Sequence, residues 1–119
     1  MRVEARADRR AALGDRENEL SWLYAAFDSN PQSGDIAAEL ADLAMELGHY
    51  EVALKALRAI TSMKNPSAMT RPMAYLKQAK IAYQQGDERK AVFFAKKAQA
   101  EDAEFIEAKE FLQVIGQGG

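Results

Sequence analysis

The sequence predicts an all-helical protein, and three observations support that prediction. Alanine, leucine, glutamate, lysine and glutamine are frequent among the 119 residues, and these residue types favour helices. Residues branched at Cβ are sparse, and no stretch alternates between apolar and polar in the way that a strand does. Short breaks rich in glycine and proline divide the chain into segments of helical character, so we expect about seven helices.

The predicted helices can be justified in order from the breaks between them. The breaks fall at Gly14, at 29–34, at 48–49, at 65–72, at 86–87 and near 101–102. Residues 35–47 and 50–63 carry apolar side chains at spacings of three and four, which is typical of amphipathic helices. Asp87 is expected to cap the helix that follows it, and Pro72 suits the first turn of another helix.

The last predicted helix covers residues 103–116. One face of it carries the apolar residues Phe105, Ala108, Phe111, Leu112 and Ile115. The glutamates of the segment are expected in solvent, and they are Glu104, Glu107 and Glu110. A helix with one apolar face at the end of a helical array is expected to close the array by covering its apolar end.

Three glycines between predicted helices recur at a nearly fixed period. Gly14 and Gly48 are 34 residues apart, and Gly48 and Gly86 are 38 apart. A period in this range indicates a stack of repeated units. Small residues recur at fixed distances from the glycines, among them Ala41 and Ala79 before the glycine and Ala53 and Ala91 after it.

This pattern resembles the tetratricopeptide repeat, a helix–turn–helix unit of 34 residues. The resemblance implies antiparallel helix pairs stacked as a right-handed α-solenoid, with Ala53 and Ala91 buried where helices cross closely. Glycine would end the first helix of each pair because it adopts a left-handed turn freely. The chain would form a single domain, with a degenerate or capping repeat at 1–33, repeats at 34–66 and 70–102, and the closing helix at 103–116.

The sequence departs from the repeat pattern at several positions. Arg6, Arg10 and Glu19 replace expected apolar or small residues in the first repeat. Gln78 stands where the last repeat usually has leucine. Ala38 and Asp42 occupy the positions where some family members clamp the terminal carboxylate of a chaperone with lysine and asparagine, so no carboxylate clamp is expected there.

The composition argues against an enzyme and against a membrane span. The chain has no cysteine, so it contains neither disulfides nor thiolate metal ligands. His49 is the only histidine, and we expect it in a solvated turn rather than in a catalytic or metal site. No glycine-rich phosphate loop is present, so we expect no enzyme activity, no metal and no cofactor. No apolar run approaches the roughly 18 residues of a membrane span, and we expect a cytoplasmic protein.

The charges are segregated although the net charge is only −2. Residues 17–51 contain eight acids and no lysine or arginine, whereas residues 55–97 contain ten bases and two acids. Two interpretations stay open, which are pairing between neighbouring repeats of one chain and pairing between two chains in a homo-oligomer. The isoelectric point of about 5.5 and the core spacing of most aromatic residues argue against a nucleic-acid partner.

The resemblance implies a concave groove as the functional surface. The residues expected to line it are Asp42, Met45, Glu46, Met73, Leu76, Lys80 and Tyr83. One part of this groove is acidic and the other is apolar and aromatic, which suits a peptide or helix with apolar anchors. In the alternative, Leu76 and Tyr83 pack beneath Phe111 of the closing helix and leave little open groove.

Two functions follow from these expectations. The first is a non-catalytic protein-interaction scaffold that binds a peptide or a partner helix in the groove. The alternative is a small chaperone for secretion or assembly of one client protein, a class in which three-repeat proteins of this family occur. The sequence names no partner, and it leaves open whether the chain is one part of a longer repeat array.

Overall fold

A computed structural model describes the backbone of residues 2–117 and the side chains of residues 14–116. Within this range the chain forms six α-helices and no strand, so the prediction of an all-helical protein is confirmed. The helices are α1 (Arg2–Ser29), α2 (Gly34–Leu47), α3 (Tyr50–Ser62), α4 (Arg71–Gln84), α5 (Glu88–Glu101) and α6 (Ile106–Gln117). None of these six helices is both long and apolar enough to cross a membrane.

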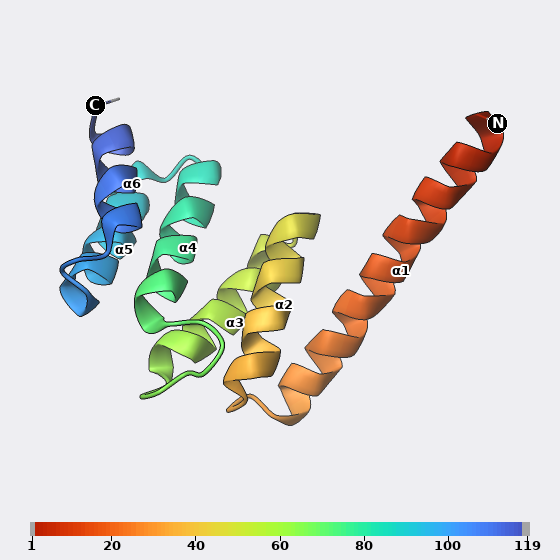
Figure 1. Ribbon diagram of the computed structural model, residues 1–119, viewed down its shortest axis with the longest axis horizontal. Helices are drawn as coiled ribbons and strands as arrows, with labels where there is room; N and C mark the ends of the chain where they lie inside the picture. Colours follow the sequence, from red (N-terminus) through yellow and green to blue (C-terminus); the bar gives the residue numbers. More distant parts are fainter. Residues whose placement is uncertain (1, 118–119) are drawn as a thin grey trace.

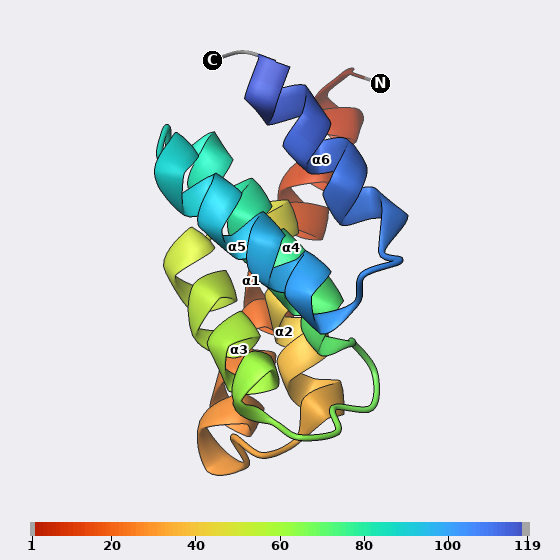
Figure 2. The same ribbon diagram turned by 90° about the vertical axis from the view of Figure 1, so that its left-hand side faces the viewer.

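The helices form two layers in an elongated molecule. Helices α2, α4 and α6 lie on one side and α3 and α5 on the other (Figures 1 and 2). The main contacts run between helices that follow one another in the sequence, from α1 with α2 to α5 with α6. The radius of gyration is 16.2 Å, whereas a compact chain of this length would have about 13.5 Å. The molecule is therefore more extended than a compact domain of the same length.

Local hydrogen bonds fix the start of α2 and the turn that joins α2 to α3. The Ser33 hydroxyl accepts the backbone N–H of Ile36 at 3.3 Å and caps the start of α2. Helix α2 ends at Gly48, whose φ of 80° lies in the left-handed region. The next backbone N–H, that of His49, then donates to the carbonyl of Ala44 at 2.8 Å, so the chain turns sharply into α3.

The pair α4–α5 repeats this local structure. Thr70 caps the start of α4, Gln85 caps its end, and Gly86 follows with a φ of 82°. The backbone N–H of Asp87 donates to the carbonyl of Ala82 at 2.9 Å, as His49 does to Ala44 in the first pair. The Asp87 side chain accepts the N–H of Lys90 at 3.1 Å, which confirms the predicted cap of α5. Pro72 lies in the first turn of α4, as predicted.

The apolar core is largest where α1, α2, α3 and α4 meet. Leu40, Leu57 and Ile60 are completely buried there. Smaller clusters between α4, α5 and α6 contain Leu76 with Ala108 and Ala82 with Ile115, and these complete the stack. The alanines predicted at close crossings, Ala53 and Ala91, are completely buried, which confirms that part of the prediction.

Helix α6 covers the end of the stack with the predicted face. Ala108 and Ile115 are buried, and Phe111 and Leu112 are partly buried, as is Phe105 directly before the helix. The three glutamates are exposed, as expected. The opposite side is not wholly polar, because Ile106 and Val114 are also exposed.

The prediction of a helix break at Gly14 is wrong. Gly14 lies inside α1, which runs without interruption from Arg2 to Ser29, and its φ is not positive. The physical reason lies in the segment before it, whose only large apolar residues besides Met1 are Val3 and Leu13. Folding that segment back would bury little apolar surface, whereas a glycine within a helix costs only about 1 kcal/mol. The predicted roles of Arg6 and Arg10 fall on side chains outside the described residues.

The second half of α1 is held against the first helix pair. Leu20 and Phe27 are buried in the main core. Arg16 forms an ion pair with Glu46 of α2. The Lys55 ammonium of α3 donates to the Tyr24 hydroxyl at 2.9 Å, and this hydrogen bond raises the pKa of Lys55. The second half of α1 therefore packs as a single helix against the pair α2–α3.

Candidate interaction surfaces

The predicted groove residues come from two helices of the same layer. Asp42, Met45 and Glu46 lie on α2, and the other four lie on α4. The two helices run beside each other in Figures 1 and 2, and the ion pair between Asp42 and Lys77 joins them directly. The structure therefore places the two halves of the predicted set on two helices of one layer.

The acidic half of the set is already engaged by neighbouring cations. Asp42 is exposed and pairs with Lys77, and Glu46 is exposed and pairs with Arg16. Met45 is partly buried and packs against the main core. Exposed ion pairs contribute at most about 1 kcal/mol, so a partner could displace them at little cost.

One of the four predicted groove residues on α4 is not at the surface, and this is a correction. Leu76 is completely buried among Ala98 of α5 and Ala108 of α6, with Phe111 packed at the side. The closing helix needs an apolar surface beneath it, and Leu76 supplies that surface. The alternative prediction, in which Leu76 packs beneath the closing helix, is therefore the correct one for this residue.

The remaining residues on α4 differ in their exposure. Met73 is partly buried between two core clusters. Tyr83 contacts the Phe111 ring edge-on at 6.1 Å between centroids, yet 45% of its surface is exposed. Lys80 is exposed one turn earlier and has no ion pair within residues 14–116. Lys80 and Tyr83 are therefore the groove residues most open to a partner.

Trp22 is the most exposed large apolar residue among the side chains of residues 14–116, and it is not among the predicted groove residues. It is 77% exposed on α1, in a shallow depression shared with Asn18, Ser21 and Ala25. The apolar stripe that packs α1 into the core contains Leu20 and Phe27, and helical geometry places Trp22 away from that stripe. That mismatch was the signal by which the sequence could have identified Trp22 as a surface residue.

A second exposed aromatic residue lies on α5. Phe93 is 53% exposed, and the Lys97 ammonium lies 5.2 Å from its ring centroid and 5.6 Å from that of Tyr75. Phe93 also meets Phe94 edge-on at 5.3 Å. Core packing, which was the expected reason for most aromatic residues in the basic segment, does not account for Phe93.

Few of the bases in residues 55–97 form ion pairs within the described chain. Of its ten bases, Arg71 pairs with Glu101 at 2.7 Å and Lys77 pairs with Asp42. Only the second of these pairs joins the acidic segment to the basic one. No other base of residues 55–97 forms an ion pair with the described residues. Pairing between two chains stays a prediction.

The single histidine has a structural contact that the sequence did not indicate. His49 Nε2 lies 3.0 and 3.1 Å from the two carboxylate oxygens of Glu17. This contact joins α1 to the turn between α2 and α3, and His49 is exposed there, as expected. Among the side chains that the structure describes, no group of three or more His, Cys, Asp or Glu residues is arranged to hold a metal ion.

The surfaces therefore consist of exposed aromatic, apolar and cationic side chains on rigid helices. Comparison of this chain with family models, with curated proteins and with solved structures gave no match. The resemblance to tetratricopeptide repeats accordingly stays a prediction from the sequence.

Proposed function

We propose that this chain is a non-catalytic protein-interaction module that binds a peptide or a partner helix along α2 and α4. The observation that carries the proposal is the pair Lys80 and Tyr83. Both are exposed at neighbouring positions of α4, and Tyr83 is braced by Phe111. A braced tyrosine offers a large contact area at little entropic cost, and lysine offers a charge without an internal partner.

The chemistry of this face defines the partner. Tyr83 and the partly buried Met73 and Met45 suit a large apolar anchor in the partner. Lys80 suits an acidic residue near that anchor. The same face has no paired lysine and asparagine at the clamp positions, where Ala38 is buried and Asp42 carries a negative charge.

A repeat architecture supports this function. We propose that the pairs α2–α3 and α4–α5 are successive units of a right-handed solenoid similar to tetratricopeptide repeats. The support is the recurrence of the same left-handed glycine and the same backbone hydrogen bond in both turns. Stacked units of this kind provide extended, rigid surfaces that accept peptides.

The test uses peptides selected from a display library on the purified protein. Each selected peptide is titrated by calorimetry against wild type, Tyr83→Ala and Lys80→Glu. Tyr83→Ala should weaken binding by about 1–3 kcal/mol, because a braced aromatic anchor is lost. Lys80→Glu should slow association and change its dependence on salt.

Phe93→Ala is the matched control, because Phe93 is exposed to a similar degree but lies on α5. It should bind the selected peptides as wild type does. If Phe93→Ala abolishes binding while Tyr83→Ala and Lys80→Glu do not change it, the working surface is the basic face of α5 and the proposal fails.

A further inference from the structure

Gln78 is the only buried polar residue among the side chains that the structure describes. It is 2% exposed on α4, and its amide nitrogen has no hydrogen-bond partner within residues 14–116. The two arginine nitrogens that are also unpaired belong to Arg16 and Arg71, which form ion pairs through their other nitrogens. A buried amide without a partner destabilises a fold, so Gln78 requires an explanation beyond packing.

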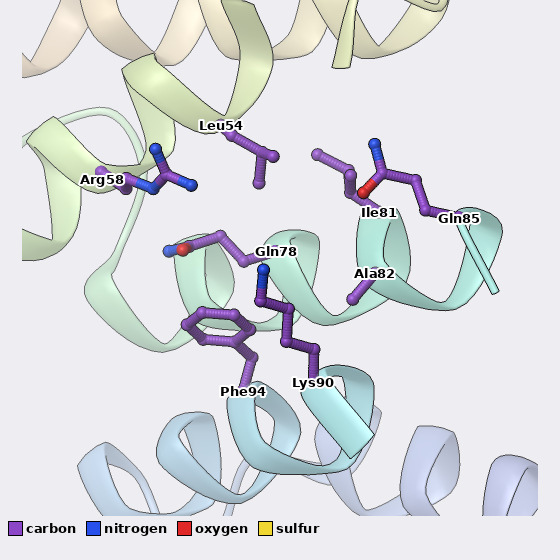
Figure 3. Close-up of a pocket in the computed structure, with 8 residues that line it drawn as sticks. All are labelled: Leu54, Arg58, Gln78, Ile81, Ala82, Gln85, Lys90 and Phe94. Atoms are coloured by element: carbon purple, nitrogen blue, oxygen red, sulfur yellow. The ribbon is translucent and has the colours of Figure 1, made fainter. Parts of the chain in front are cut away.

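Gln78 borders a small cavity between α3, α4 and α5. The polar side chains around it are those of Gln78, Gln85, Arg58 and Lys90, and the apolar walls include Leu54, Ile81 and Phe94. Figure 3 shows the amide between the Arg58 guanidinium and the Phe94 ring, with the Lys90 side chain extending toward the same space. The cavity volume is about 40 Å³, and one water needs about 10–15 Å³ of such space. The cavity thus holds about three water-sized groups, the number of heavy atoms in a carboxylate.

The repeat does not need polar residues at these positions. Counted from the glycines, the cavity residues Gln78, Gln85, Lys90 and Arg58 correspond to Leu40, Leu47, Val52 and Tyr24 at the preceding interface. Leu40 is completely buried in the apolar core, and the other three are partly buried. The same backbone geometry is therefore filled by apolar and aromatic side chains at one interface and lined by polar ones at the next.

The charges around the cavity define its ligand. Arg58 and Lys90 form no ion pair with any described residue, and no acidic residue lines the cavity. The Gln78 amide nitrogen adds a buried donor. A ligand with two acceptor oxygens and a negative charge would meet both cations and the amide. The apolar walls would contact a short methylene stem behind the charged group.

We propose that this cavity binds the carboxylate of a glutamate side chain of a protein partner. Arg58 and Lys90 neutralise the carboxylate, and Gln78 donates a hydrogen bond to one of its oxygens. Leu54, Ile81 and Phe94 contact the two methylenes of the glutamate stem. Aspartate has one methylene, so its shorter stem would not carry the carboxylate as far into the cavity. None of the predicted groove residues lines this cavity, so the site does not depend on the peptide surface along α2 and α4.

The test is a titration of the ¹⁵N-labelled protein followed by NMR. The probe is N-acetyl-glutamate N-methylamide, and the signals are the side-chain amide of Gln78 and the backbone amides of residues 78–94. We expect saturable shifts centred on Gln78. The glutamine analogue of the probe, which lacks the charge, should cause no such shifts, and the aspartate analogue should bind more weakly.

Variants distinguish binding in the cavity from nonspecific binding of an anion to surface cations. Arg58→Gln and Gln78→Leu should each lower the affinity for the probe by about tenfold or more, since each removes a direct hydrogen-bond donor. Lys96→Gln is the matched control, because Lys96 is an exposed cation on α5 that does not line the cavity. It should bind as wild type does. Arg58 is exposed, so its variant keeps the test valid even if Gln78→Leu changes the local packing.

Four outcomes would overturn the proposal. The first is the absence of saturable shifts at Gln78, which leaves water as the occupant of the cavity. The second is equal binding of the glutamine analogue. The third is an equal loss of affinity in Lys96→Gln and Arg58→Gln. The fourth is tighter binding of a probe that carries only a free terminal carboxylate. None of these results depends on the peptides used to test the surface along α2 and α4.

Discussion

The helix pairs α2–α3 and α4–α5 share their backbone geometry and differ in the residues that fill it. Both turn at a left-handed glycine, both place alanine where the helices cross, and both repeat one backbone hydrogen bond across the turn. Eight residues before the glycine, the first pair buries Leu40 and the second buries Gln78. The two pairs therefore share their turn chemistry and their small residues, and they differ in the larger residue at this interior position.

The difference has a consequence for function. A leucine at this position closes the interface, because it fills the space with apolar atoms on all sides. A glutamine at the same position keeps the space polar and, together with Arg58 and Lys90, leaves a cavity. In the proposed glutamate site, a few differences between corresponding positions create a binding site while the turns keep the same geometry.

The largest expected effect comes from giving the first pair the residue of the second. Leu40→Gln should lower the free energy of unfolding by about 2–4 kcal/mol, because apolar burial is lost and an amide is buried without a partner. Urea unfolding followed by circular dichroism measures this change. An unchanged midpoint would show that the two interfaces tolerate polar groups equally, and the comparison would lose its basis.

The reciprocal substitution should have the opposite sign. Gln78→Leu should raise the free energy of unfolding by about 1–3 kcal/mol, because the unpaired buried amide is removed and the cavity is filled. The same urea titration measures it. A loss of stability would mean that Gln78 already has a satisfied contact, such as an ordered water, which leucine cannot replace.

Substitutions at the alanine crossings test the feature that the two pairs share. Ala53→Leu and Ala91→Leu should each cost about 1–3 kcal/mol, because both sites are completely buried and have no space for three more carbons. Thermal melts of both variants provide the measurement. Unchanged melting in either variant would show that the helices of that pair do not cross closely.

The glycines should separate into two kinds. Gly48→Ala should cost about 1–2 kcal/mol, because alanine is strained at a φ of 80° although no atom crowds its Cβ. Gly14→Ala should instead stabilise the protein by about 1 kcal/mol, because Gly14 lies within α1. The melting temperatures of both variants, compared with that of wild type, measure these changes. A lower melting temperature for Gly14→Ala would favour the turn that the sequence predicted at Gly14.

The smallest expected effect concerns the ion pair that joins the two pairs of helices. Asp42→Asn should change stability by less than about 1 kcal/mol, because both charges of the Asp42–Lys77 pair are partly or largely exposed. Melts at low and high salt should converge for wild type and variant. A larger loss would show that this contact organises the interface between α2 and α4.

The sequence by itself determined the helical class, the positions of two turns and the small residues at the crossings. Each of these depends on local chemistry, since Gly48 and Gly86 need the left-handed conformation and Ser33, Thr70 and Asp87 cap helices through neighbouring backbone groups. The face of α6 that packs inward followed from helical spacing in the same way. Such features require no knowledge of distant residues.

The tertiary structure decided the features that depend on what lies across an interface. Gly14 resembles the other glycines in sequence, but the segment before it has too little apolar surface to fold back, so α1 stays one helix. Leu76 and Tyr83 belong to the same predicted groove, but α6 buries the first and only braces the second. Gln78 was visible as a departure from the repeat. Only the packing of α3 and α5 against α4 places Arg58 and Lys90 beside it, because burial and cavities arise from residues far apart in the chain.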